Sequence, residues 1–117
     1  MIVHEIIMKY EKSMLLEVLG DSVENRIIDF LMEGRGISYS KTDIAGGCEI
    51  SRPTVYKVLP RMTKNGVISF ERKLGTISLY KINEQNEKIK ALFKLEEILL
   101  KESFEQIELK TVPAPGS

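Results

Sequence analysis

The chain has 117 residues, of which 43% are apolar and 29% are charged. This length fits one domain, and the composition is typical of a globular protein and excludes an intrinsically disordered one. Basic and acidic residues each number 17, so the formal net charge is zero. Because dedicated nucleic-acid binders are often basic overall, this balance weighs against that class unless the charge is unevenly placed.

The sequence also points away from secreted and membrane proteins. Cys48 is the single cysteine, so no intrachain disulfide can form and nothing indicates an oxidising compartment. No apolar run approaches the ~20 residues of a membrane-spanning helix. His4 and Glu5 interrupt the apolar N-terminus, which has no small-residue cleavage site and so does not look like a signal peptide. We therefore expect a cytoplasmic protein without membrane contact.

The N-terminal part predicts two helices. Residues 1–10 fit a strand or a helix start equally well, and residues 13–19 predict a short helix. Asp21 or Ser22 then caps a second helix, with Glu24 placed to complete a capping box from Asp21. Apolar residues at helical spacing, followed by a glycine stop, define this helix: Val23, Ile27, Phe30, Leu31 and then Gly34.

Two short helices joined by a tight turn are predicted next. Ser40 is a good N-cap for the first, and Asp43 in its first turn favours the helix dipole. Glu49 occupies the turn. Ser51 caps the second helix, and Pro53 in its first turn costs no hydrogen bond. A core stripe at helical spacing runs along the second helix: Val55, Val58, Leu59 and Met62.

A β-hairpin follows the helix pair. Residues 67–73 and 76–82 are β-branched or aromatic runs around Leu74-Gly75. The order of elements predicts a mainly α protein with a small β-hairpin wing (α+β), which is a winged helix-turn-helix with helical extensions at both ends. The predicted parts are an N-terminal packing or dimerisation segment at 1–19, the winged helix-turn-helix at 20–83, a dimerisation helix at 84–105 and a flexible tail at 106–117.

The second helix of the pair has a cationic face opposite its core stripe. Thr54, Lys57, Arg61 and Lys64 follow one another at spacings of three and four residues. Cations bind phosphates, and donors such as those of arginine and lysine read base edges in the major groove. The alternative is a solvated basic face without a partner. Because the stripe coincides with the turn and the hairpin, we favour DNA.

The neutral net charge hides a local excess of positive charge. Between Lys41 and Lys81 there are eight cations and three anions, a local charge of +5 that the rest of the chain balances with −5. A basic centre between acidic flanks suits a protein that presents one surface to a phosphate backbone.

Two further places could contact phosphate. Arg72 and Lys73 stand at the hairpin tip, where a wing can follow the DNA backbone or the minor groove; the alternative is protection of a sheet edge. Ser40 and Lys41 open the first helix of the pair, where a helix N-terminus can hold phosphate; plain capping is the alternative and does not exclude the first.

Pro60 lies in the middle of the second helix, where it removes the hydrogen bond to the Tyr56 carbonyl at a cost of ~3 kcal/mol. A kink is expected there. It either fits Arg61 and Lys64 to the DNA backbone or has no direct role, and the sequence leaves both interpretations open.

The sequence shows no catalytic constellation, so we expect neither an enzyme nor a cofactor. Cys48 is expected to be a small core residue, and no histidine or cysteine stands at metal-ligand spacing from it. The last helix is apolar over more than one face, which a second copy of the chain would cover; a clamped position between the domain and the N-terminal segment is the alternative. The predicted dimer contacts are Leu92, Leu95, Ile98 and Leu99.

Three motifs give the chain a family resemblance: Leu-Gly-Asp-Ser at 19–22, Tyr-Ser-Lys-Thr-Asp-Ile-Ala at 39–45 and Ile-Ser-Arg-Pro-Thr-Val-Tyr-Lys-Val-Leu-Pro-Arg at 50–61. With them, residues 19–95 resemble the winged-helix transcription regulators of bacteria and archaea, broadly the MarR/ArsR-like group, and are most similar to small archaeal members. The resemblance implies a dimeric, site-specific DNA binder with contacts from Ser51, Arg52, Thr54, Lys57, Arg61, Arg72 and Lys73. Ser40, Lys41, Pro53 and Lys64 complete the predicted DNA-binding surface.

The chain departs from this group in two ways. Glu49 stands where glycine is usual, so the turn must be strained or of another type. The metal-binding cysteines of ArsR-type proteins are missing, so metal sensing is not implied. We therefore expect a homodimeric repressor that binds double-stranded DNA, with any small-molecule effector unknown. The alternative is a winged-helix interaction module of a transcription, replication or RNA assembly, without its own operator.

Overall fold

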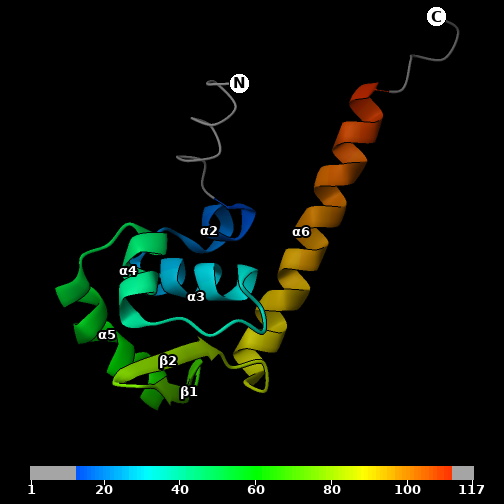
Figure 1. The fold of residues 1–117 in the computed structure, drawn as a ribbon. Helices are drawn as coiled ribbons and strands as arrows, with labels where there is room; N and C mark the ends of the chain where they lie inside the picture. Colours follow the sequence, from blue (N-terminus) through cyan, green and yellow to red (C-terminus); the bar gives the residue numbers. More distant parts are fainter. Residues whose placement is uncertain (1–12, 112–117) are drawn as a thin grey trace, which may run out of the picture.

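The computed structural model describes residues 13–111 and confirms the predicted mainly α fold with a two-stranded hairpin (Figure 1). The expectations for residues 1–10 and 112–117 lie outside the described residues. The elements are α2 (Met14–Leu19), α3 (Val23–Glu33), α4 (Lys41–Cys48), α5 (Arg52–Lys64), β1 (Ile68–Leu74), β2 (Ile77–Ile82) and α6 (Glu87–Thr111). None of these helices is long and apolar enough to cross a membrane.

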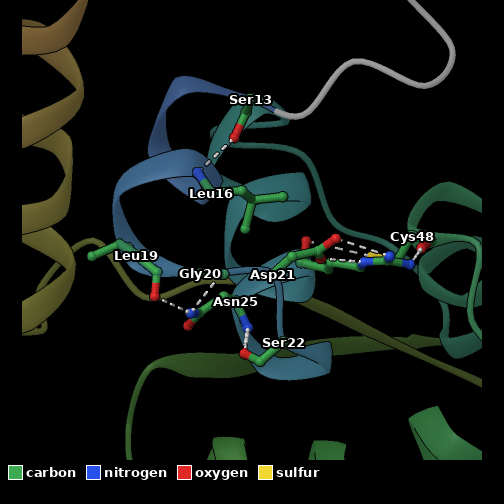
Figure 2. Close-up of polar contacts among 9 residues, drawn as sticks. Ser13, Leu16, Leu19, Gly20, Asp21, Ser22, Asn25 and Cys48 are labelled. Atoms are coloured by element: carbon green, nitrogen blue, oxygen red, sulfur yellow. Dashed lines mark hydrogen bonds and ion pairs between the residues drawn. The ribbon is translucent and has the colours of Figure 1, made fainter.

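Serine hydroxyls begin the first two described helices (Figure 2). Ser13 Oγ accepts from the Leu16 N–H, and Ser22 Oγ accepts from the Asn25 N–H, each at 3.1 Å. Of the two predicted caps of α3, Ser22 is therefore right, and the capping box from Asp21 is wrong. The Asp21 carboxylate is instead paired with Arg26, one turn into the same helix.

The core lies between α3, α4, α5 and the hairpin. It is closed by α6, whose Ile89 is fully buried. The core stripe predicted for α5 is confirmed, since Val55, Val58, Leu59 and Met62 are all buried. Cys48 is also a core residue, as predicted, and burial raises the pKa of its thiol to about 12, so it stays protonated.

The hairpin turns at Gly75 and Thr76, one residue later than predicted. The last strand pair is Leu74 with Ile77, and Gly75 has a φ of 66°, which glycine adopts without strain. A register shift between Phe70 and Arg72 leaves Glu71 as an extra residue, a β-bulge. The hairpin also pairs with the connection between α3 and α4. There Tyr39 exchanges backbone hydrogen bonds of 2.7 and 2.8 Å with Tyr80 of β2.

Helix α6 differs from the prediction at both ends. It begins at Glu87 and not at 84, because Asn86 Oδ1 accepts from the N–H groups of Lys88 and Ile89 and so caps the helix there. It ends at Thr111, so residues 106–111 of the predicted tail are helical. Its first turns lie along the domain, and its far half projects beyond it (Figure 1).

Three acidic residues meet where α3 packs near α6. Asp29 is only 9% exposed, and its Oδ1 has no hydrogen-bond partner among the described residues. Burial raises the pKa of Asp29, although a hydrogen bond from Ser13 opposes this. Burial and the charge of Asp29 likewise raise the pKa values of Glu33 and Glu96.

The helix pair depends on a glycine at position 47. An added Cβ there would lie 2.2 Å from the Phe30 ring, which packs on Tyr39 with 4.8 Å between ring centroids. We predict that Gly47→Ala lowers the free energy of unfolding by about 1–3 kcal/mol, because the stacked ring cannot move freely. Gly46→Ala is the control: nothing lies within 4 Å of its Cβ, and alanine favours the helix. Urea denaturation compares the two, and equal effects would contradict the close contact.

We also predict that Asp29→Asn raises the melting temperature at neutral pH. The folded-state pKa of Asp29 lies above the unfolded one, so wild-type stability falls as the pH rises through the folded pKa, by about 1.4 kcal/mol for each unit of elevation. The advantage of the variant should vanish below the ordinary carboxyl pKa. Thermal melts between pH 3.5 and 7.5 test this, with the exposed Glu97→Gln as control. An advantage that is the same at every pH would be contrary to it.

Candidate nucleic-acid interface

The turn between α4 and α5 is made by a non-glycine residue in the left-handed region. Glu49 has φ 55° and ψ 46°, and its N–H group bonds back to the carbonyls of Ala45 and Gly46. This confirms the expected strained turn, since such a conformation costs an ordinary residue roughly 1–2 kcal/mol. The strain must be offset by contacts on both sides of the turn.

One of those contacts is a polar chain from α3. Arg26 forms an ion pair with Asp21, and its Nη1 donates to the Cys48 carbonyl at 3.3 Å. That carbonyl belongs to the last residue of α4, so the guanidinium satisfies an acceptor that the helix end leaves free. Figure 2 shows Asp21 and Cys48 at the two ends of this chain. The connection fixes the end of α4 just before the turn.

Beyond the turn, α5 begins as predicted. Ser51 Oγ accepts from the Thr54 N–H at 3.3 Å, and Pro53 lies in the first turn. The Ser51 and Thr54 hydroxyls are 2.7 Å apart and hydrogen-bond each other. The helix continues through Pro60 to Lys64.

The opposite sides of α5 have different environments. One side is the buried core stripe, and Arg52, Lys57 and Lys64 are exposed on the rest of the helix. Among residues 13–107, no carboxylate forms an ion pair with any of these three cations. Unpaired cations on a rigid helix are available to an anionic partner. We name the stripe of Thr54, Lys57, Arg61 and Lys64 the basic face; Arg52, in the first turn, lies elsewhere around the helix.

Arg61 is the exception on the basic face. Its guanidinium forms an ion pair with Glu24, in the first turn of α3, and both side chains are about half exposed. An exposed pair of this kind contributes little to stability, on the order of 0–1 kcal/mol. The ion pair nevertheless holds the Arg61 side chain in one orientation, and Glu24 competes with any phosphate for it. The sequence could not reveal this pair, because its residues are 37 apart.

At the start of α4 the structure confirms capping. Ser40 and Asp43 form a reciprocal capping box with distances of 3.1 and 3.2 Å, so the Ser40 hydroxyl is already engaged. Lys41 lies with its Nζ 4.5 Å from the centroid of the Tyr56 ring, a cation–π contact. Tyr56 is 53% exposed on α5 and was not among the predicted site residues. Its signal was an aromatic residue outside the core stripe of the second helix.

The outer half of the hairpin is free of the domain. Every residue from 70 to 77 is exposed, including Arg72 and Lys73. The nearby Glu71 pairs with Lys81 at 3.2 Å, so it does not neutralise Arg72 or Lys73. Figure 1 shows the hairpin beside α5, while the end of α6 points away from both. The predicted cations of α5 and of the wing thus belong to one end of the molecule.

The predicted dimer residues have different environments. Leu92 and Leu95 pack against the core of their own chain, Leu99 is partly buried, and Ile98 is 45% exposed. Three apolar side chains further along α6 are exposed: Leu100 at 43%, Phe104 at 66% and Ile107 at 53%. These last three were not among the predicted contacts.

Comparison with known proteins identifies the fold. No protein-family model matches the chain, and no curated protein does either. Among solved structures it is similar to NadR in complex with 4-hydroxyphenylacetate, with a TM-score of 0.59 and 20% identity over 94% of this chain and 76% of that one. The chain has a winged-helix fold.

Two other solved structures are similar to this winged helix. A mutant of MepR from Staphylococcus aureus, bound to an oligodeoxyribonucleotide, has a TM-score of 0.56 and 18% identity over 96% of this chain and 79% of that one. A mutant of TubR, from type III plasmid segregation, has a TM-score of 0.54 and 21% identity over 72% and 88%. At such identities the likeness shows the fold alone.

Proposed function

We propose that the protein is a homodimeric, sequence-specific regulator of transcription that binds double-stranded DNA and represses by covering a promoter. In this proposal α5 enters the major groove, and the wing lies on the backbone or in the minor groove. The observation that carries it is the basic face: its exposed Lys57 and Lys64 have no carboxylate partner among residues 13–107, and the other side of the helix is fixed in the core. A helix held in this way can present donors to base edges and phosphates together.

Two further observations support DNA as the partner. The local charge of +5 between Lys41 and Lys81 falls on the helix pair and the wing, which the fold brings to one end of the molecule (Figure 1). The similar MepR mutant is described as bound to an oligodeoxyribonucleotide. In such a complex Arg61 has two possible roles. It either leaves Glu24 and binds a phosphate, or it keeps the ion pair with Glu24 and so holds α5 in its orientation.

Dimerisation is proposed through the far half of α6. The helical stripe that is buried at Ile89 continues past the domain at Leu100, Phe104 and Ile107, because these positions lie within about 60° of one another around the helix. An exposed apolar stripe of this kind is expected to be covered by a partner. A second copy covers both stripes at once and matches a palindromic site.

The first test selects bound duplexes from a random pool and then measures affinity against salt concentration. We predict that Lys57→Gln weakens binding and reduces the slope of log affinity against log salt by about one, because one phosphate contact is lost. Lys94→Gln, on the exposed side of α6, is the matched control and should change neither. Affinity that is absent or independent of salt would reject DNA binding and favour the interaction module.

The second test addresses the dimer. We predict that Phe104→Gln weakens self-association at least tenfold, because Phe104 is the most exposed large apolar side chain between Glu87 and Ile107 of α6. Glu105→Gln, its exposed neighbour, controls for the site of the change. Sedimentation equilibrium measures both variants. A wild-type monomer at micromolar concentration would overturn the proposed dimer.

A further inference from the structure

The tip of the wing carries an apolar pair where turns usually carry polar residues. Leu74 and Ile77 face each other as the last strand pair and are 62% and 51% exposed. Only Gly75 and Thr76 lie between them, so no larger side chain covers the pair from the end of the hairpin. Neither residue packs on the core.

The tip also carries the charges that direct such a pair to nucleic acid. Residues two apart on a strand share a face, so Arg72 lies on the same face as Leu74, while Lys73 lies on the other face, opposite Ser78. Both cations are exposed, and none of the described carboxylates forms an ion pair with them. The apolar pair is therefore bracketed by positive charge on both faces of the hairpin.

This charge pattern selects among possible occupants. A second copy docked tip to tip would bring like charges together, which is costly. A DNA minor groove offers phosphates on both walls for Arg72 and Lys73 and base edges at its floor. The groove is about 6 Å wide, so only the narrow end of a hairpin can enter it.

We propose that Leu74 and Ile77 form an apolar wedge that enters the minor groove beside the α5 site, partly unstacks one base step and bends the DNA. This inference rests on the proposed DNA binding. Wedges of leucine or isoleucine between base steps bend duplexes by about 20–90°. The step should be a pyrimidine–purine step, because those unstack most easily. The wing would then recognise how easily the DNA deforms, in addition to contacting its phosphates.

The experiment uses the full chain and a duplex from the random-pool selection. Fluorophores at the two duplex ends report bending by energy transfer, and 2-aminopurine at the central steps reports unstacking. With wild-type protein we expect a bend of about 20–90° and a rise in 2-aminopurine fluorescence at one step. With the double variant Leu74→Thr/Ile77→Thr we expect both signals to be lost and affinity to fall about tenfold, with the salt slope unchanged because no charge is removed.

Ile37→Thr is the matched control, since Ile37 is 54% exposed in the connection between α3 and α4. It should leave the bend and the affinity unchanged. Threonine is favourable in strands, so the hairpin is retained, and circular dichroism checks it. The wild-type 2-aminopurine signal tests the wedge without any variant.

Three results would overturn the inference. A straight, fully stacked duplex bound tightly by wild-type protein would reject the wedge and leave the proposed function intact. Absence of duplex binding would reject the proposed function itself and the wedge with it. Loss of self-association in the double variant, with DNA bending unchanged, would assign the tip to a second copy of the chain.

Discussion

The burial of one side of α5 is the interaction on which the whole interface depends. Val55 is fully buried and Leu59 almost so, and they fix the rotation of the helix about its own axis. The rotation decides which side chains reach outward, and they are the cations Lys57 and Lys64. If the helix rotated by half a turn, the core would receive charges without partners, at a cost of several kcal/mol. Stability and the orientation of the basic face are therefore one property of this helix.

The contacts around the turn serve the same end. Glu49 holds a left-handed conformation that glycine would adopt at lower cost. The Arg26 guanidinium fixes the residue just before it, and Gly47 lets α4 approach the Phe30 ring. These contacts come from α3, which therefore sets the position of α5 through the end of α4. The ion pair of Arg61 with Glu24 links α3 to α5 directly.

Local signals were sufficient to predict most of the fold. Ser40, Ser51 and the α5 stripe act within one or two helical turns, so the sequence shows them. The cap of α3 could not be predicted, because Asp21 and Ser22 are equally good caps by residue type. In the structure Asp21 pairs with Arg26, five residues along the chain, and Ser22 caps the helix. The end of α6 was misplaced because apolar periodicity in the sequence weakens after residue 104, while the helix continues to Thr111.

The sequence predicted which charged residues belong to the candidate site, but it did not predict which residues they contact. Exposure of Lys57 and Arg72 follows from periodicity and from the hairpin pattern. The contact of Lys41 with Tyr56 and the pairing of Arg61 join residues 15 and 37 positions apart, which no spacing rule connects. The acidic residues Asp29, Glu33 and Glu96 gather where α3 packs near α6, because folding brings two helices together.

The most direct test of the basic face is a titration of isotopically labelled protein with a selected duplex, followed by amide NMR spectra. We expect the shifts to concentrate in Ser51 and α5 and in residues 72–77 of the wing, on the side of the molecule opposite the far end of α6 (Figure 1). Shifts confined to α2 and α6, with α5 unchanged, would contradict it.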